Sequence, residues 1–251
     1  MEKRIKDFNG FLLEKENELF LNSPHREWEK PEKDWSYYQE WNRVLFMHWE
    51  VSYEDLRPLV PSQLELDSFE GKFWVSVVPF TMEKIRPAYL PSFSPISDFH
   101  EINVRTYVKS GGKKGVYFIN IEAEKFVSAF ISRSLSGLPY EKSNIERGQG
   151  FYKSTNKNKG FYLDVEYKVG PRISEKTPLM VWLSERYCLY MNKDEKIYMY
   201  EIDHSEWEME KLEIEKLDIN YSIGGIKINK MPDIYHYSPG VKVRAWAAKE
   251  I

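Results

Sequence analysis

The chain has 251 residues, of which 42% are hydrophobic and 30% are charged, and its formal net charge at pH 7 is −3. This composition argues against a disordered protein, because enough apolar surface is present to offset the entropy lost on folding. The small negative charge argues against nucleic-acid binding, which requires a basic surface for the phosphate backbone. The single cysteine, Cys188, excludes an intrachain disulfide and a cysteine-based zinc site.

The sequence shows neither a targeting segment nor a membrane span. Met1–Phe8 is rich in charge and no apolar run follows it, so it does not resemble a signal peptide. No stretch approaches the roughly 20 apolar residues that a transmembrane helix needs. We therefore expect a cytoplasmic protein without membrane contacts. Residues 1–24 are predicted to form an N-terminal helical arm, and residues 25–251 a single domain.

The first predicted elements are a strand, a short helix and a second strand. The aromatic and aliphatic run Trp41–Trp49 predicts a buried strand, and Ser52 opens a Ser-x-x-Asp cap that is typical of a helix start. Phe73–Phe80 is rich in valine and aromatic residues and follows the turn signal Glu70-Gly71-Lys72. It is predicted to be the second strand of a hairpin.

The remaining elements continue this strand-rich pattern. Phe99–Lys109 and Val116–Glu124 flank a Gly-Gly loop and predict a hairpin, whereas Lys125–Leu135 has helical spacing. A further helix is expected to open at Thr177-Pro178, and further strands at Gly150–Ser154, Phe161–Lys168, Arg186–Asn192, Ile197–Asp203 and Val241–Ala248. We therefore expect an α+β fold in which a mostly antiparallel sheet curves into a cone or barrel with a few peripheral helices.

The predicted strand Phe99–Lys109 carries the most informative polar residues. Side chains alternate along a strand, so Glu101, Asn103 and Arg105 share one face. A half-polar strand often exposes its polar face to solvent, and this alternative remains open. Glu101 and Arg105 lie roughly 13 Å apart along the strand, so Asn103 or a ligand has to connect them.

A series of short motifs follows this strand pattern in a recognisable order. They are Trp41–Trp49, Leu56–Pro61 with Leu64–Asp67, Phe73–Phe80, Glu101–Val108, Leu138–Tyr140 and Glu185–Tyr187, with a looser match at His204–Trp207. Their order resembles that of the YqjF-like family of uncharacterised bacterial proteins. That family is similar in fold to acetoacetate decarboxylase, and the resemblance implies a curved β-cone that holds a buried pocket.

The resemblance also implies which catalytic group is missing. Acetoacetate decarboxylase forms a Schiff base between a lysine and its keto acid, and Tyr140 and Glu141 stand at the positions that match its lysine pair. Neither a phenol nor a carboxylate forms an imine with a ketone, so decarboxylation is expected to be absent. Glu101 matches a pocket glutamate of that enzyme, Trp74 replaces its second one, and Arg43 matches its substrate arginine.

Other polar residues are weaker candidates. Arg133 and Arg186 are able to hold a ligand carboxylate through paired hydrogen bonds, but each is more often the partner of a structural acid. No nucleotide-binding or nucleophile-elbow motif occurs, so no cofactor is expected. Metal-ligand spacing is also missing among the histidines, so no metal is expected at His48, His100, His204 or His236.

Three functions remain open. The first is binding of a small anionic or acyl-type metabolite in an internal cavity, where Glu101, Asn103 and Arg105 orient it. The second is a cofactor-independent acid–base enzyme in which Glu101 moves a proton and Tyr140 donates one, while Arg105 stabilises an enolate or carboxylate. The third is a protein without a ligand, whose polar strand face forms a buried network or a homo-oligomer interface.

Overall fold

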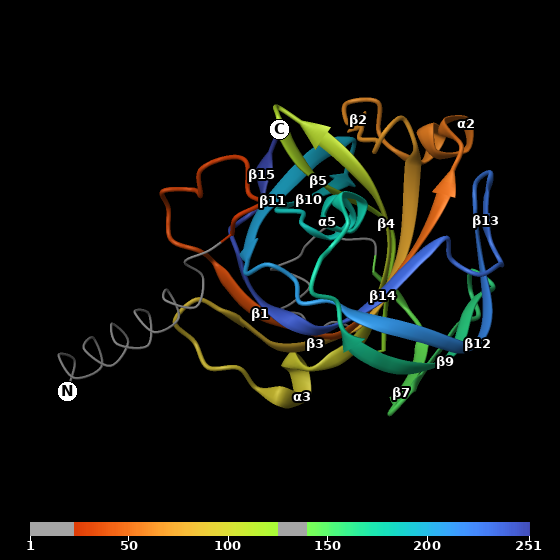
Figure 1. Ribbon diagram of the computed structural model, residues 1–251. Helices are drawn as coiled ribbons and strands as arrows, with labels where there is room; N and C mark the ends of the chain where they lie inside the picture. Colours follow the sequence, from red (N-terminus) through yellow and green to blue (C-terminus); the bar gives the residue numbers. More distant parts are fainter. Residues whose placement is uncertain (1–22, 125–139) are drawn as a thin grey trace.

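Strands make up most of the structure, a computed structural model that describes residues 23–124 and 140–251. They join into one large, strongly curved sheet (Figure 1). The helical segments are α2 (Tyr53–Leu56), η1 (Arg57–Leu59), α3 (Ser94–Ser97) and α5 (Pro178–Ser184). The strands are β1 (Tyr37–Val51), β2 (Glu65–Leu66), β3 (Phe73–Pro87), β4 (Phe99–Ser110), β5 (Lys113–Ala123), β6 (Tyr140–Lys142), β7 (Asn144–Gly148), β8 (Phe151–Asn156), β9 (Phe161–Arg172), β10 (Cys188–Lys193), β11 (Lys196–His204), β12 (Glu210–Ile223), β13 (Ile226–Ile228), β14 (Ile234–Ala245) and β15 (Lys249–Glu250).

The sheet closes on itself through β14. The pairing order runs β11–β10–β5–β4–β3–β1–β14, and Ile202–His204 of β11 pair in turn with Val243–Ala245 of β14. These strands form a ring in which every neighbouring pair except β5–β10 is antiparallel. β14 also pairs with β12, from which β9, β8 and β7 continue as an outer layer. The predicted fold class, a curved and mostly antiparallel sheet with few helices, is confirmed.

Several local signals in the sequence produce the predicted elements. Ser52 caps α2, because its hydroxyl oxygen accepts a hydrogen bond from the backbone N–H of Asp55 at 3.0 Å. Thr177 caps α5 in the same way through the N–H of Met180. In the β4–β5 hairpin both turn glycines have positive φ, 56° at Gly111 and 79° at Gly112, as a two-residue turn of this kind requires.

The structure departs from the predicted elements at several places. β3 does not form a hairpin with the segment before Glu70–Lys72; it pairs with β1 and β4, because its apolar residues on both faces suit the interior of a ring. Val241–Ala248 is not one terminal strand, since β14 ends at Ala245 and β15 follows. β12 was missed because its exposed face is charged. The helix predicted at Lys125–Leu135 and most of the predicted 1–24 arm lie outside the described residues.

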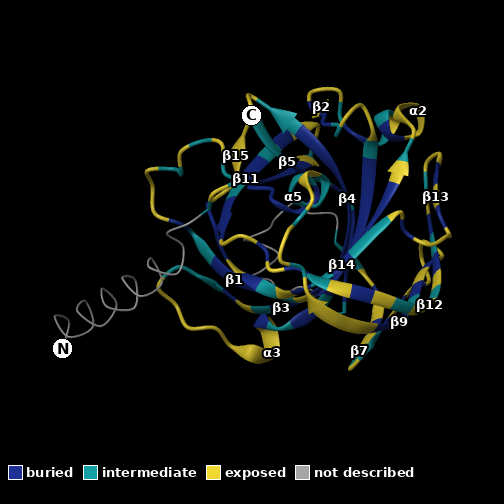
Figure 2. Ribbon diagram, viewed as in Figure 1, coloured by how far each residue is buried: buried dark blue, intermediate teal, exposed yellow. Residues whose placement is uncertain are grey.

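Two apolar cores lie on the two faces of the ring strands. Ile102 and Val104 of β4 belong to the core between the ring and the outer strands, whereas Tyr107 belongs to the core inside the ring. β1 divides in the same way, with Met47 on the outer side and Phe46 inside. β1 and β4 are therefore buried on both faces along most of their length, as the dark blue of β4 shows (Figure 2).

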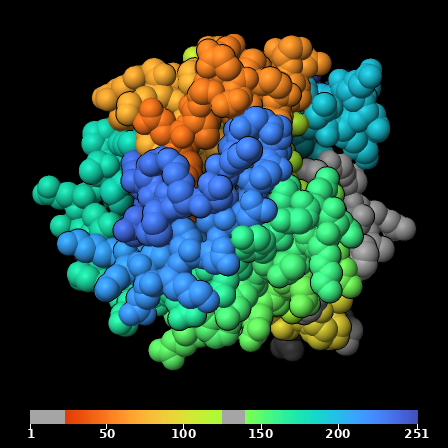
Figure 3. Space-filling model, turned by 90° about the vertical axis from the view of Figure 1, so that its right-hand side faces the viewer, coloured from red at the N-terminus to blue at the C-terminus, as the bar shows by residue number. Residues whose placement is uncertain are grey.

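A contact between distant parts of the chain braces the outer layer. In Figure 3 the orange segment around α2 lies against the blue C-terminal segment. At this junction a Cβ atom added to Gly224 would come within 2.7 Å of Leu59 Cδ2, and the φ of Gly224 is +57°. The positive φ favours glycine at this position, and the Leu59 side chain would have to shift to admit a Cβ atom.

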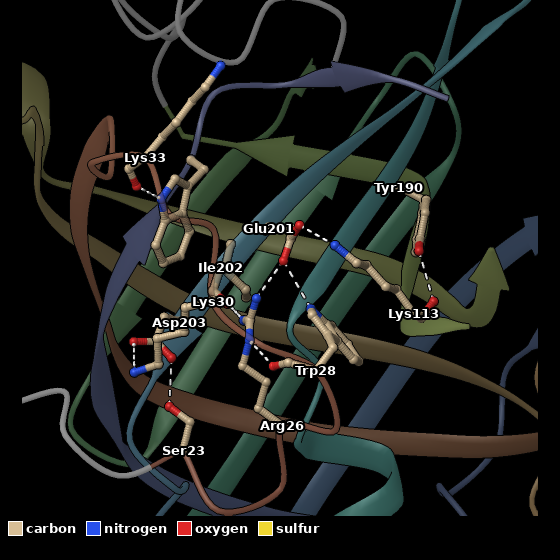
Figure 4. Close-up of polar contacts among 11 residues, drawn as sticks. Ser23, Arg26, Trp28, Lys30, Lys33, Lys113, Tyr190, Glu201, Ile202 and Asp203 are labelled. Carbon is tan, nitrogen blue, oxygen red and sulfur yellow. Dashed lines mark hydrogen bonds and ion pairs between the residues drawn. The ribbon is translucent and has the colours of Figure 1, made fainter. Parts of the chain in front are cut away.

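The segment Ser23–Asp34 is fastened to the outside of β11, and we call it the N-terminal clasp. Arg26 donates hydrogen bonds to the Glu201 carboxylate at 2.5 Å and to the carbonyl oxygen of Ile202 at 2.7 Å (Figure 4). The indole of Trp28 donates to the same Glu201 carboxylate at 2.9 Å, and Ser23 donates to Asp203 at 2.6 Å. These charge-assisted bonds hold the clasp against the ring.

Candidate functional site

The polar face of β4 points into the ring. Glu101, Asn103 and Arg105 are only 3%, 8% and 6% exposed. On β3, Ser76 lies directly opposite Arg105, and neighbours opposed in this way project to the same face. This face is therefore buried within a single chain, and the alternative of a solvent-exposed polar face is excluded.

Glu101 and Tyr140 meet at one end of this polar face. The Tyr140 hydroxyl donates a hydrogen bond to Glu101 Oε2 at 3.1 Å, from a position on β6 that the parallel pairing with β5 fixes. Burial raises the pKa of Glu101 to about 8, against the opposing hydrogen bonds from Tyr140 and Asn103. Burial also raises the pKa of the Tyr140 phenol well above 10. This shift favours the neutral acid form of Glu101 near pH 7.

Arg105 is a buried cation whose guanidinium is only partly satisfied. It hydrogen-bonds Tyr107, but its Nε and Nη2 have no partner among the described residues. Two other buried arginines each have a carboxylate, Arg186 with Asp67 at 2.7 Å and Arg244 with Asp203 at 2.8 Å. Burial lowers the pKa of Arg105, because desolvation penalises its charge. Within the described chain, Arg105 lacks such a counter-ion.

His48 continues the polar row across the neighbouring strand. It lies opposite Ser76 on β1, and its Nδ1 is 2.7 Å from the Ser76 hydroxyl. The Ser76 hydroxyl is in turn 2.7 Å from the Tyr107 hydroxyl, which donates to the carbonyl oxygen of Leu183 at 3.0 Å. This network connects three ring strands to the last turn of α5.

His236 and Trp207 complete the row around the ring of Phe46. The Phe46 ring centroid is 4.9 Å from that of His236, 5.0 Å from that of Trp207 and 5.7 Å from Cζ of Arg105. Both ring nitrogens of His236 and the indole nitrogen of Trp207 are buried without a partner in the described part of the chain. We call this set of residues the polar belt: His48, Ser76, Arg105, Tyr107, Trp207 and His236.

Comparison with known proteins identifies the family. The model of the DUF2071 family, described as uncharacterised conserved proteins, matches residues 38–242. The uncharacterised protein YqjF of Bacillus subtilis (strain 168) is 34% identical over 229 residues, covering 88% of this chain and 94% of YqjF. The chain belongs to the DUF2071 family. The resemblance predicted from the order of the sequence motifs is thus confirmed.

Solved structures similar to this DUF2071 chain share the acetoacetate-decarboxylase-like fold. An acetoacetate decarboxylase-like enzyme from Sphingomonas wittichii RW1 has a TM-score of 0.58 at 12% identity, covering 90% of this chain and 98% of that one. The enduracididine biosynthesis enzyme MppR complexed with pyruvate has a TM-score of 0.56 at 10% identity, covering 90% and 93%. An acetoacetate decarboxylase has a TM-score of 0.54 at 16% identity, covering 85% and 88%. At these identities the likeness establishes the fold.

The remaining predicted site residues lie at different places in the DUF2071 fold. Trp74 is buried in the core inside the ring, and its indole N–H has no partner among the described residues. Arg43 is exposed and hydrogen-bonds Thr81, which lies opposite His100 and therefore on the other face of the sheet from Glu101. The structure thus does not bring Arg43 to Glu101. Arg133 lies outside the described residues.

The polar belt contains residues that the sequence alone did not single out as functional. From the sequence, His48 and His236 were considered only as metal ligands, with no metal expected there, and Ser76 and Trp207 were included only inside family motifs. His48 did carry a usable signal, because it interrupts an apolar strand that is buried on both faces. His236 carried none, since its place beside Phe46 depends on the pairing of β1 with β14.

Other classes of site receive less support. The described residues contain no group of three metal-ligating side chains, and none of their helices is long and apolar enough to cross a bilayer. The expected absence of a metal or cofactor stays a prediction. A surface hollow of about 350 Å³ lies beside α5 and includes Trp182. The Trp182 ring centroid is 4.6 Å from that of Tyr107, so this one side chain touches both the hollow and the polar belt.

Proposed function

We propose that the protein binds a small carboxylate-bearing metabolite inside the strand ring. The observation that carries this proposal is Arg105, a buried guanidinium with two unpartnered nitrogens among the described residues. A buried cation is costly without a counter-ion, and a planar carboxylate satisfies a guanidinium through two parallel hydrogen bonds. The ligand would therefore supply the charge that Asp67 and Asp203 supply to the other buried arginines.

The two ends of the polar face suggest how the ligand is oriented. Its carboxylate lies at Arg105, because Arg105 is the buried cation of this face, whereas Glu101 at the other end carries no positive charge and would repel an anion if ionised. Asn103 lies between them, and its Oδ1 is buried without a partner in the described residues. Asn103 would thus accept a hydrogen bond from the middle of the ligand. The structure of MppR with pyruvate supports the proposal, because pyruvate is a small carboxylate held by a protein of this fold.

Schiff-base chemistry is not part of the proposed function. The positions that match the decarboxylase lysines hold Tyr140, which bonds Glu101, and Glu141, whose carboxylate lies 3.4 Å from Lys159. Lys142, the adjacent lysine in sequence, is exposed. Because these positions carry no amine, no imine forms there, and the ligand is not required to be a ketone.

An acid–base enzyme is the second candidate. The pKa of Glu101 near 8 and its hydrogen bond to Tyr140 favour it, because a general acid works best when its pKa lies near the operating pH. In this alternative Glu101 transfers a proton to or from a carbon atom of the bound ligand, while Arg105 binds the ligand's carboxylate. Turnover of a stabilising ligand, followed by NMR, would distinguish it from binding without reaction.

The binding proposal is tested by thermal unfolding with a panel of small carboxylates. A ligand at 100 times its Kd adds about 2.7 kcal/mol, which raises the Tm by several degrees at roughly 2 to 4 °C per kcal/mol. Arg105→Met should abolish this shift. It should leave the ligand-free protein about as stable as before, because a buried charge without a counter-ion is removed.

Two controls make the result specific. Methyl esters of the same acids should not stabilise the wild type, since they lack the negative charge. Arg244→Met removes a buried arginine that already has a carboxylate partner, so it should destabilise the protein yet keep the ligand shift. Equal stabilisation of wild type and Arg105→Met by a carboxylate, or no stabilisation of the wild type at all, would overturn the proposal.

A further inference from the structure

The surface hollow beside α5 is a cavity of ligand size that the proposed carboxylate site does not use. Its volume is about 350 Å³, and small-molecule sites span about 300 to 1,000 Å³. Three separate parts of the chain form its walls: the N-terminal clasp, the loop around Phe69, and the segment from α5 to Tyr187. A molecule bound here would therefore contact the clasp and the body of the fold at once.

Aromatic side chains form much of the lining of this hollow, and we call four of them the aromatic wall: Trp28, Phe69, Trp182 and Tyr187. The indole of Trp28 is held by its hydrogen bond to Glu201 at 2.9 Å (Figure 4). The ring centroid of Trp182 lies 5.9 Å from that of Phe69 and 4.1 Å from Cζ of Arg186. Rings held in place before binding lose little entropy on binding, and they favour a second planar ring.

The charges around the hollow are already compensated. Every acidic or basic side chain that lines it contacts a side chain of the opposite kind. These contacts are Glu27–Lys114 at 2.7 Å, Glu185–Lys176 at 3.3 Å, His25–Glu206 at 3.3 Å and Arg186–Asp67 at 2.7 Å. A charged ligand would lose water here without gaining a counter-ion of its own. The lining therefore favours a neutral ligand.

Arg186 adds one unmet hydrogen bond to the hollow. Its Nε donates to the carbonyl oxygen of Trp182 at 2.7 Å and its Nη1 to Asp67 at 2.7 Å, whereas its Nη2 has no partner among the described residues. Arg186 lines the hollow and is only 3% exposed. A buried N–H without an acceptor is costly. Because Asp67 already balances the charge of Arg186, a neutral carbonyl oxygen suffices as that acceptor.

We propose that the hollow binds a neutral, planar aromatic compound, whose ring packs against the aromatic wall and whose carbonyl oxygen accepts a hydrogen bond from Arg186. This site is separate from the proposed carboxylate site at Arg105 and does not depend on it. Aromatic acids and amines are poorer matches, since neither finds an unpaired counter-ion in the hollow. Benzamide is a simple compound with the required ring and carbonyl group.

NMR titrations with four compounds test the parts of this proposal separately. Benzamide should bind saturably to the wild type. Cyclohexanecarboxamide keeps the amide but has no aromatic ring, so its Kd should be about two- to tenfold higher. Toluene keeps the ring but has no carbonyl group, so its Kd should be about tenfold higher. Benzoate is measured by its displacement of benzamide, so that binding at Arg105 does not count, and it should compete about tenfold more weakly or less.

Two matched substitutions locate the bound ring. Phe69→Leu removes one ring from the aromatic wall and should raise the Kd of benzamide about two- to tenfold. Phe69 is only partly buried, so the variant should fold. Phe93→Leu makes the same change at a phenylalanine that is 64% exposed and does not line the hollow, and it should leave the Kd unchanged.

A further measurement needs only the wild type. In isotope-filtered NOE spectra the ring protons of benzamide should show contacts to the indole protons of Trp28 and Trp182. Absence of saturable binding, equal affinity for benzamide and cyclohexanecarboxamide, or equal effects of the two substitutions would overturn the proposal. None of these results would bear on carboxylate binding at Arg105.

Discussion

The carboxyl group of Glu101 is buried away from water. Its side chain lies inside the ring and faces the phenol of Tyr140, and burial is the main reason that its pKa rises from 4.5 to about 8. A raised carboxyl pKa affects stability with a definite sign. Between pH 4.5 and 8 the folded state holds a proton that the unfolded chain has released. The free energy of unfolding therefore falls as the pH rises through this window.

We predict that Glu101→Gln removes this pH dependence. The variant and the wild type should have similar stability near pH 4.5, and the variant should be more stable at pH 8 by an amount of the order of a few kcal/mol. Urea titrations at several pH values measure the free energy of unfolding of both proteins. His48 and His236 contribute equally to both, so their contributions cancel in the difference between wild type and variant. An exposed carboxylate changed in the same way, Glu213→Gln, is the control. A wild-type-minus-variant difference that stays flat with pH would contradict burial of Glu101.

Prediction from sequence reached some site residues and missed others for a clear reason. Alternation along one strand is a local property, so the shared face of Glu101, Asn103 and Arg105 could be predicted. The partners of that face come from other strands. His48 reaches this face because β1 pairs with β3, and His236 reaches it because β14 pairs with β1. Neither pairing can be predicted from a local sequence pattern.

At the scale of elements, the N-terminal clasp depends on Arg26. This side chain is only 3% exposed and bonds both a carboxylate and a backbone carbonyl of β11. We predict that Arg26→Ala destabilises the protein by about 1 to 3 kcal/mol, because the carbonyl oxygen of Ile202 loses its charged donor. Glu201 loses one donor and keeps Trp28 and Lys113. Trypsin should also cleave after Lys33 faster in the variant, because the clasp loses its main attachment.

The control for the clasp is Glu29→Ala, an exposed position on the same segment. It should change neither the Tm nor the cleavage rate. Equal cleavage of wild type and Arg26→Ala would show that Trp28 and Ser23 suffice to hold the segment.

Elements defined by caps and turns were predicted well. The Ser52 cap and the two positive-φ glycines of the β4–β5 turn depend only on neighbouring residues. They can therefore be predicted without knowledge of the tertiary structure. β12 was not predicted, because an outer strand with a charged face has few apolar residues to show its period. Strand partners were least accessible, as the pairing of β3 illustrates.

At the scale of the whole molecule, β14 closes the ring. It contacts β1, β11 and β12, so strands from both ends of the chain belong to one hydrogen-bonded unit. We predict that residues 25–251 unfold in one cooperative transition, as a single domain does. Tryptophan fluorescence and far-UV circular dichroism should give the same midpoint and the same m-value. Two separated transitions would show that the outer strands form an independent unit.

Homo-oligomerisation stays a prediction, and the structure limits which surface it uses. The polar face of β4 is buried within one chain, so an interface between copies would have to use other residues. The resemblance to the acetoacetate-decarboxylase fold supplied the ring shape that local patterns could not. Local patterns in turn located most of the strands that build it.

Two indoles inside the ring have a practical consequence. Trp74 and Trp207 have buried N–H groups without a partner in the described chain. The excited state of indole changes energy when its N–H gains a hydrogen bond or when the polarity around it changes. A molecule that fills the ring alters both, so the protein's own emission spectrum becomes a label-free gauge of occupancy for any compound that can be titrated.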